Sequence, residues 1–159
     1  MSEKTDFGPM DPALAQALAR TLARDAIRDL VARYNANGDT GRFAQVRELF
    51  TTDAVMTIEP NDEYVGIEAI MTIFTGTSTN TSSAAALTHV RHFTSTHQID
   101  FEDDDQASGR LYFAVITDVG LDHWGRYVDR YVRTPQGWRI ARRSVSVDGW
   151  SESSLFPRL

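Results

Sequence analysis

The sequence contains no cysteine among its 159 residues. This absence excludes disulfide bonds, a thiolate nucleophile and a zinc–thiolate site. No apolar run approaches the roughly 18 residues that a membrane-spanning helix needs. The opening residues, MSEKTDFGPMD, include no apolar stretch of the kind that a secretory signal requires. We therefore expect a cytoplasmic protein without a membrane partner.

Positive charge is also in deficit, because 16 Lys and Arg face 22 Asp and Glu for a net charge of −6. A nucleic-acid partner is not expected, since phosphate binding needs a basic surface. The sequence has no P-loop, no dinucleotide-binding glycine motif and no G-x-S-x-G motif. The histidines lack zinc-binding spacing, and the acidic run EDDD lacks the spacing of a calcium loop. We expect no metal and no cofactor.

The composition is that of a single folded domain. Hydrophobic residues make up 42% and charged residues 24% of the chain, which are ordinary values for a globular protein. Residues 1–11 have the composition of a flexible tail, residues 12–150 carry regular hydrophobic patterns, and residues 151–159 form a C-terminal tail. We predict one domain over residues 12–150 with a tail at each end.

Three helices are predicted in the first half of this domain. They cover residues 12–37, 42–50 and 66–74. The apolar stripe of the first helix consists of Leu14, Leu18, Leu22, Ile27, Leu30, Val31 and Tyr34. Asp11 before Pro12 provides an N-cap and a first-turn proline, and Gly38 provides a C-terminal stop.

The second half of the domain shows the patterns of β-strands. Strands are predicted over residues 54–59, 87–102, 108–120, 123–133 and 137–150. Residues 75–86, TGTSTNTSSAAA, are poor in large apolar side chains and favour a loop, or a lid over a site. Helices followed by consecutive long strands indicate an α+β fold. We expect a curved, mixed or antiparallel sheet with three N-terminal helices packed on its concave face.

Three titratable residues do not fit this apolar pattern. His92, in the strand segment VRHFTST, is either a core histidine with satisfied ring nitrogens or a general base. Strand alternation groups Arg139, Ala141, Arg143, Val145 and Val147 on one face. Arg143 therefore needs an acidic neighbour or a polar pocket, since an unpaired buried cation is prohibitively costly. Asp39 lies at a corner between two predicted helices, where it caps the second helix or orients an imidazole.

A second group of polar residues lies in the strand that follows residue 122. Tyr127, Asp129 and Tyr131 alternate on one face of that strand. Their polar groups either line a pocket or are satisfied within a packed core.

The outer face of the sheet is a predicted contact surface. Alternation places His89 and His97 on the face opposite His92. It places Arg91, Phe93 and Ile99 on that same outer face, which indicates contact with another copy of the chain as a homodimer or homotrimer.

Three stretches of the sequence resemble a known family. They are RDAIRDLVARYNANGDTGRFAQVRELFTTDAVMTI, HVRHFTSTHQIDF and GRYVDRYVRTPQGWRIARRSVSVDGW. They are similar to the opening helices and first strand, the histidine strand and the closing hairpin of the SnoaL-like branch of the superfamily that includes nuclear transport factor two, ketosteroid isomerase and scytalone dehydratase. The resemblance covers roughly residues 20–150 and implies a cone-shaped α+β fold.

The resemblance also implies a site. Scytalone dehydratase and hexachlorocyclohexane dehydrochlorinase use an Asp–His dyad for proton abstraction and elimination, and the family positions fall on Asp39 and His92. The arginine of the dehydrochlorinase falls on Arg143.

This sequence departs from both enzymes at other positions. Tyr34 stands where the dehydrochlorinase has a lysine, and Thr117 lies near the second catalytic histidine of scytalone dehydratase. The pocket serine and asparagine of scytalone dehydratase fall near Gly125 and Tyr127. Neither substrate carries over to this chain.

The matching positions predict a cofactor-independent lyase or isomerase of the dehydratase or dehydrohalogenase kind, acting on a small, fairly apolar molecule. His92 is the expected base, Asp39 orients it, and Arg143 stabilises developing negative charge. The expected substrate-binding residues are Tyr34, Thr117, Tyr127 and Asp129, of which either tyrosine is a candidate to return a proton to a leaving oxygen. The alternatives are a non-catalytic small-molecule binding protein and the small subunit of a ring-hydroxylating oxygenase.

Overall fold

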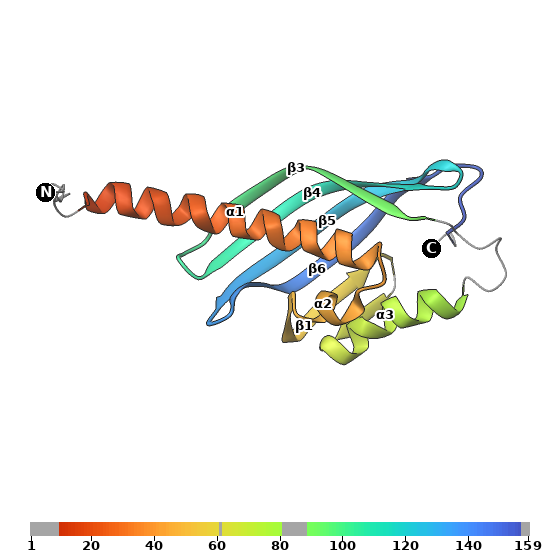
Figure 1. The fold of residues 1–159 in the computed structure, drawn as a ribbon, viewed down its shortest axis with the longest axis horizontal. Helices are drawn as coiled ribbons and strands as arrows, with labels where there is room; N and C mark the ends of the chain where they lie inside the picture. The colour runs from red at the N-terminus through yellow and green to blue at the C-terminus, as the bar shows by residue number, and fades with distance from the viewer. Residues whose placement is uncertain (1–9, 61, 81–88, 157–159) are drawn as a thin grey trace, which may run out of the picture.

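The computed structural model describes residues 10–60, 62–80 and 89–156. Within these residues, a mixed six-stranded sheet has the order β2-β1-β6-β5-β4-β3, and three helices pack on its concave face (Figure 1). The elements are α1 (Pro12–Gly38), α2 (Phe43–Arg47), β1 (Phe50–Ile58), β2 (Asp62–Val65), α3 (Ile67–Asn80), β3 (Arg91–Phe101), β4 (Gln106–Thr117), β5 (Gly120–Thr134) and β6 (Gly137–Trp150). The predicted α+β fold is confirmed. The only parallel pairing within the described sheet joins β1 to β6.

The element boundaries differ from the prediction in the first half of the chain. The second helix ends at Arg47, and β1 begins at Phe50 rather than at residue 54. The short strand β2 was not predicted. The third helix continues to Asn80, so the first part of the predicted loop is helical, and residues 81–86 of that loop lie outside the described residues. A helix with many threonines and serines is poorly predicted from local propensity, because these residues favour other conformations in isolation.

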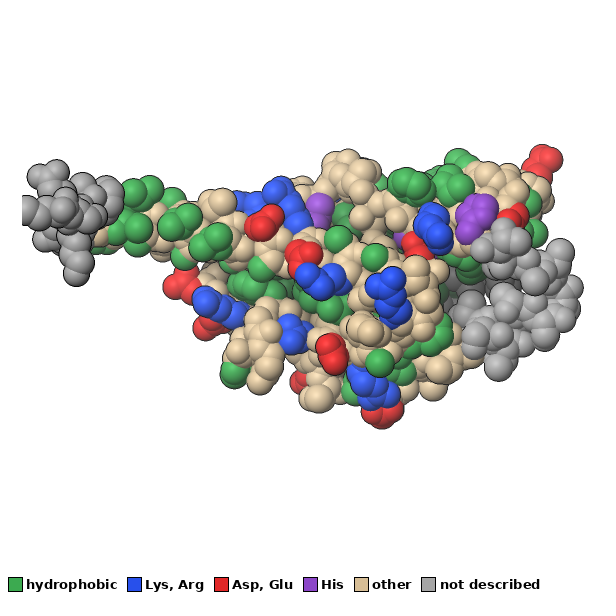
Figure 2. Space-filling model, in the orientation of Figure 1, with side chains coloured by type: hydrophobic (Ala, Val, Ile, Leu, Met, Phe, Trp, Pro, Cys, Tyr) green, Lys and Arg blue, Asp and Glu red, His purple; other side chains and the backbone are tan. Residues whose placement is uncertain are grey.

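The first helix extends well beyond the sheet (Figures 1 and 2). Its N-cap is as predicted, since Asp11 Oδ1 accepts hydrogen bonds from the backbone N–H of Ala13 and Leu14. The predicted stripe is buried only from Ile27 onward, and Met10, Leu14, Leu18 and Leu22 are exposed. The physical reason is length, because a helix of 27 residues is about 40 Å long and outreaches the strands beneath it. No helix within the described residues is long and apolar enough to cross a membrane.

The core fills the space between the helices and the inner face of the sheet. Its fully buried apolar side chains include Ile27, Val31, Val46, Met56, Ile70, Leu111, Val115 and Ile140. Burying a side chain of this size contributes about 1.5 to 3 kcal/mol, so this cluster is the main source of stability.

A β-bulge in β3 reverses which residues face the core. Thr96 and His97 together oppose Leu111 of β4, and Thr96 has a positive φ of 54°. The extra residue shifts the alternation by one position. His97 therefore lies on the inner face with His92, and Ile99 is buried, which corrects the prediction that both face outward.

A second bulge has the same effect in β6. Ile140 pairs with Tyr131 and Arg142 pairs with Arg130, which leaves Ala141 without a Cα partner on β5. Ile140 is consequently buried on the face that also holds Arg143. The prediction that Arg139 and Ala141 share that face is wrong, because alternation is interrupted at the bulge.

The strained bulge residue yields a stability prediction. A left-handed backbone costs a β-branched residue about 1 to 2 kcal/mol, whereas glycine adopts it freely. We expect Thr96→Gly to raise the free energy of unfolding, measured by chemical denaturation, by about 0.5 to 1 kcal/mol after the entropic cost of glycine. Thr94→Gly, two residues earlier on the extended part of β3, is the control and should lower it. An equal decrease in the free energy of unfolding of the two variants would show that the backbone of Thr96 is unstrained.

Candidate active site

The carboxylate of Asp39 holds the imidazole of His92. Asp39 Oδ1 lies 2.5 Å from Nδ1 of His92, and Oδ2 accepts the backbone N–H of the same residue at 2.8 Å. The Asp39 side chain is 6% exposed and the His92 side chain 26%. Since an ionised carboxylate only accepts hydrogen bonds, Nδ1 donates and Nε2 keeps its lone pair. The structure thus brings together the two residues that the family resemblance singled out.

The position of Asp39 explains this contact. Asp39 follows the last residue of α1 as its C-cap, and its backbone N–H donates to Asn35 O at 2.8 Å. The expectation that Asp39 caps the second helix is wrong, since Arg42 is the N-cap of α2 and no side chain caps it. The carboxylate is therefore available to the first residues of β3, which lie beside this end of α1.

Arg143 forms an ion pair with Asp129 that is entirely out of water. Arg143 Nε donates to Oδ1 of Asp129 at 2.9 Å, and Nη2 donates to Oδ2 at 2.6 Å. Both side chains are 0% exposed. The two residues are Cα partners on β5 and β6, so the expected acidic neighbour is a cross-strand partner. Burial alone would lower the pKa of Arg143, but Asp129 raises it above its usual value, and the guanidinium stays charged.

Two tyrosines cover the faces of this guanidinium. Its Cζ lies 4.1 Å from the ring centroid of Tyr34 and 4.3 Å from that of Tyr127. Such cation–π contacts add to the stability of the buried pair. Burial raises the pKa of Tyr34, and it raises the pKa of Tyr127 well above its usual value, so both hydroxyls stay protonated.

A chain of hydrogen bonds continues from Asp129 to β3. Tyr131 donates its hydroxyl to Asp129 Oδ2 at 2.7 Å, and His97 Nε2 lies 3.1 Å from the Tyr131 oxygen. Because the hydroxyl proton of Tyr131 is donated to Asp129, Nε2 of His97 donates the second hydrogen bond and the Tyr131 oxygen accepts it. Burial lowers the pKa of His97, which keeps that ring neutral. Gly109 leaves the room for this contact, since a Cβ there would lie 2.7 Å from Tyr131 Cε2.

Some buried polar atoms of the described residues have no hydrogen-bond partner. Among the described residues, Nη1 of Arg143 and the side-chain Nδ2 and Oδ1 of Asn35 are buried and make no hydrogen bond. An unsatisfied buried polar atom costs about 1 to 3 kcal/mol, so such groups mark places where an oxygen or nitrogen of a ligand would be stabilised. Nothing in the sequence pattern indicated Asn35.

Phe113 connects the dyad to the buried ion pair. Its ring stacks on Tyr127 with centroids 4.7 Å apart and lies 6.4 Å from the His92 ring. The dyad, Phe113, Tyr127 and Arg143 therefore form one connected series of side-chain contacts. The predicted site residues His92, Tyr34, Tyr127, Asp129 and Arg143 all contribute to it.

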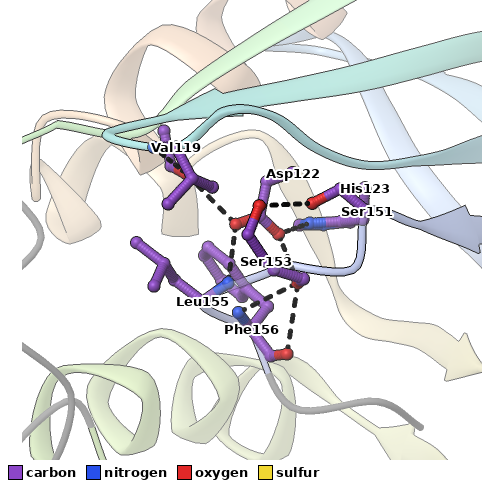
Figure 3. Close-up of polar contacts among 9 residues, drawn as sticks. Val119, Asp122, His123, Ser151, Ser153, Leu155 and Phe156 are labelled. Carbon is purple, nitrogen blue, oxygen red and sulfur yellow. Dashed lines mark hydrogen bonds and ion pairs between the residues drawn. The ribbon is translucent and has the colours of Figure 1, made fainter.

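Thr117 belongs to a different cluster, around Asp122. Figure 3 shows this carboxylate with His123 and Leu155. The Thr117 hydroxyl donates to Oδ2 of Asp122 at 3.1 Å, and His123 Nδ1 lies 2.8 Å from Oδ1 of the same carboxylate. Residues 151–156, after the last strand, fold back over Asp122: Ser154 Oγ donates to Oδ1 at 2.6 Å and the Leu155 N–H donates to Oδ2 at 2.8 Å.

This second carboxylate–imidazole pair was not predicted from the sequence. His123 lies on the same inner face as Tyr127, Asp129 and Tyr131, all of which were singled out by alternation. The same alternation, continued toward the N-terminus of β5, passes through Gly125 and reaches His123. Within the described residues, no three His, Asp or Glu side chains converge to hold a metal ion.

Comparisons with known proteins agree on the fold. A family model described as a SnoaL-like domain matches residues 19–144. An NTF2-like protein with a cystatin-like fold from Novosphingobium aromaticivorans is 26% identical, with a TM-score of 0.76, over 92% of this chain and 96% of that one. None of the curated proteins matches the sequence significantly.

Two further solved structures carry the names of enzymes. A candidate scytalone dehydratase from Novosphingobium aromaticivorans is 19% identical, with a TM-score of 0.76, over 88% of this chain and 93% of that one. A hexachlorocyclohexane dehydrochlorinase from Novosphingobium barchaimii is 17% identical, with a TM-score of 0.72, over 89% of this chain and 99% of that one. At these identities the likeness is one of fold.

The buried ion pair yields a second stability prediction. Asp129→Asn should lower the free energy of unfolding by about 3 to 5 kcal/mol, because it leaves the Arg143 guanidinium buried without a counter-charge. Urea denaturation monitored by tryptophan fluorescence measures this loss. Glu102→Gln is the matched control: it breaks the exposed Arg130–Glu102 pair and should cost less than about 0.5 kcal/mol. Similar losses in both variants would contradict the central role of the buried pair.

Proposed function

Because the chain belongs to the SnoaL-like domain family, we propose that it is a cofactor-independent lyase or isomerase that removes a proton from a small, fairly apolar substrate. The observation that supports this proposal is the contact between Asp39 and His92. One carboxylate binds both the backbone N–H and the ring Nδ1 of His92, which fixes the orientation of the ring. A fixed imidazole with a free Nε2 lone pair is the arrangement of a general base.

In this proposal His92 is the base and Asp39 its positioning residue. Nε2 of His92 takes a proton from a carbon next to a carbonyl group, or from a carbon adjacent to one that bears a leaving group. As the ring becomes an imidazolium, the buried carboxylate of Asp39 stabilises the new positive charge. A positioned general base of this kind contributes about 10²–10⁴-fold to the rate.

Arg143 contributes hydrogen-bond donors rather than a free positive charge. Its positive charge is balanced by the carboxylate of Asp129, whose Oδ2 lies 2.6 Å from Nη2. An anion that does not contact the guanidinium directly is therefore only weakly attracted to it. Its Nη1 group has no partner among the described residues, and it is the group that we assign to a developing enolate oxygen. Removing one such preorganised donor typically costs about 3 to 4 kcal/mol of transition-state stabilisation.

The remaining predicted substrate-binding residues act in two ways. Tyr34 and Tyr127 line the inner surface next to Arg143 and contact the apolar part of the substrate. Asp129 and Thr117 act through other residues, since the first is engaged by Arg143 and Tyr131 and the second by Asp122.

We also propose that the chain forms a homodimer or homotrimer through the outer face of its sheet. The exposed apolar residues of this face lie on β3, β4 and β5, and they include Phe93, Tyr112, Trp124 and Val128. Phe93 and Trp124 share the partner Ala114 on β4, so they lie on either side of one strand. Contiguous apolar surface of this kind marks contacts between proteins.

The catalytic proposal predicts the behaviour of two variants. The probe is β-chloropropiophenone, whose elimination to phenyl vinyl ketone needs only a base at the carbon next to the carbonyl, because chloride leaves without a proton. His92→Gln should lower kcat/KM by at least about 100-fold. Asp39→Asn should lower it by about 10-fold or more, since the ring loses its anionic partner.

His89→Gln is the matched control, because His89 pairs with Asp118 at 3.4 Å, outside the dyad. This variant should keep the wild-type rate. If the wild type bound the probe in a fluorescence titration without turning it over, the chain would instead be a non-catalytic binding protein.

The proposed self-association is checked by light scattering coupled to size-exclusion chromatography. The wild-type protein should elute with two or three times the mass of one chain. The double variant Phe93→Ser/Trp124→Ser should elute as a single chain, because it removes apolar area from the outer face without touching the inner one. A wild-type monomer would exclude this interface.

A further inference from the structure

A second carboxylate-held imidazole faces the same interior as the dyad. His123 Nδ1 lies 2.8 Å from Oδ1 of Asp122, and the Asp122 side chain is fully buried. Thr117, Ser154 and the Leu155 N–H occupy the other acceptor positions of that carboxylate (Figure 3). Burial alone would raise the pKa of Asp122, but these hydrogen bonds lower it, so the carboxylate is ionised.

Only Nδ1 of His123 has a hydrogen-bond partner among the described residues. Its ring is also held by two aromatic side chains, Phe113 at 6.0 Å and Phe156 at 4.8 Å between centroids. The orientation of the ring is therefore fixed, and Nε2 is the nitrogen that remains for a reaction.

The two histidines lie in one row across three strands. His92 is the Cα partner of Val115, and Val115 is the Cα partner of His123. Neighbouring strands lie about 4.8 Å apart, so the two histidines are separated by about 10 Å at their Cα atoms. Both rings also flank Phe113, at 6.4 Å and 6.0 Å between centroids. The two rings therefore lie on either side of the strand that carries Phe113.

The tyrosines of the site are poor proton donors by comparison. An elimination that expels hydroxide needs an acid, because hydroxide is a poor leaving group. Burial raises the pKa values of Tyr34 and Tyr127, which makes each phenol a weaker acid than usual. A histidine ring that is protonated on both nitrogens is the better acid for this step, and in that form Nε2 carries the proton that is given up.

We propose that His123 is the general acid of this site and that the substrate is a β-hydroxy carbonyl compound. The inference rests on the proposed function, because it requires His92 to act as the base. It assigns a role to a residue that the family resemblance does not mark, on a strand that faces the dyad across Phe113.

The proposed reaction is a dehydration. Nε2 of His92 takes a proton from the carbon next to the carbonyl, and the electron pair of that C–H bond forms the new C=C bond. The C–O bond at the next carbon breaks, its electron pair stays on oxygen, and that oxygen takes a proton from Nε2 of His123 and leaves as water. His92 ends protonated and His123 neutral, and proton exchange with solvent restores both.

The surroundings of His123 predict the pH dependence of this step. The charged or titratable groups that face it are Asp122 and His92. Burial lowers the pKa of His123 below its usual value, Asp122 opposes this shift, and His92 adds to it. Both eliminations need neutral His92 as the base, but only the dehydration needs protonated His123. The ratio of the dehydration rate to the chloride-elimination rate should therefore fall as the pH rises through this lowered pKa. Elimination of chloride needs no acid and should not fall in that range.

A pair of probes that differ only in the leaving group tests the proposal. β-Hydroxypropiophenone loses water and β-chloropropiophenone loses chloride, and both yield phenyl vinyl ketone, which is followed by its absorbance. The factor by which His123→Gln lowers the dehydration rate should be at least about 100 times the factor by which it lowers the chloride-elimination rate. His92→Gln should lose both activities, and His89→Gln should keep both. The chloride rate of His123→Gln also reports whether that variant is folded.

The possible outcomes separate this inference from the proposed function. Equal losses of the two activities in His123→Gln, or a wild-type ratio of dehydration to chloride elimination that does not fall with rising pH, would overturn the assignment of His123. An unchanged chloride-elimination rate in His92→Gln, or a wild type inactive on both probes, would overturn the proposed function itself.

Discussion

The buried ion pair between Arg143 and Asp129 organises the inner surface of the sheet. Charges wholly removed from water are tolerated only when they are close and well hydrogen-bonded, and this pair is bidentate. Because the two residues are cross-strand partners, the pair requires this register of β5 and β6. Tyr34 brings α1 onto one side of the guanidinium, and Tyr127 covers the other. This salt bridge is therefore the point at which α1, β5 and β6 contact one another in the candidate site.

The neutrality of this pair decides how chemistry can proceed nearby. A lone cation would attract any anion, whereas a compensated guanidinium contributes only directed N–H donors. In the proposed mechanism, proton transfer depends on the two imidazoles, each held at Nδ1 by its own buried carboxylate. The rings of His92 and His123 both pack beside the apolar Phe113. Such surroundings suit a substrate that is largely apolar with one polar reacting centre.

The layers of the fold could be predicted from hydrophobic periodicity, because α1 and the strands from β3 to β6 are long and regular. The contact between Asp39 and His92 could not, since the two residues lie 53 positions apart and no local pattern links them. Family resemblance supplied that pair. The burial of Ile99 and the inward position of His97 escaped prediction because a strand pattern read by simple alternation assumes that no residue is inserted.

Such single-residue insertions also shape the site. In β5, His123 pairs with Val115 and Leu121 pairs with Ile116, so Asp122 is an extra residue relative to β4. Consecutive residues of a regular strand point to opposite faces and do not contact each other's side chains. Because Asp122 is the inserted residue of the bulge, it does not follow this alternation. Its carboxylate therefore contacts the ring of His123 and also the backbone N–H of Leu155, after β6. A bulge therefore turns two neighbours in the sequence into a hydrogen-bonded pair of side chains, which is why pleat alternation alone does not reveal it.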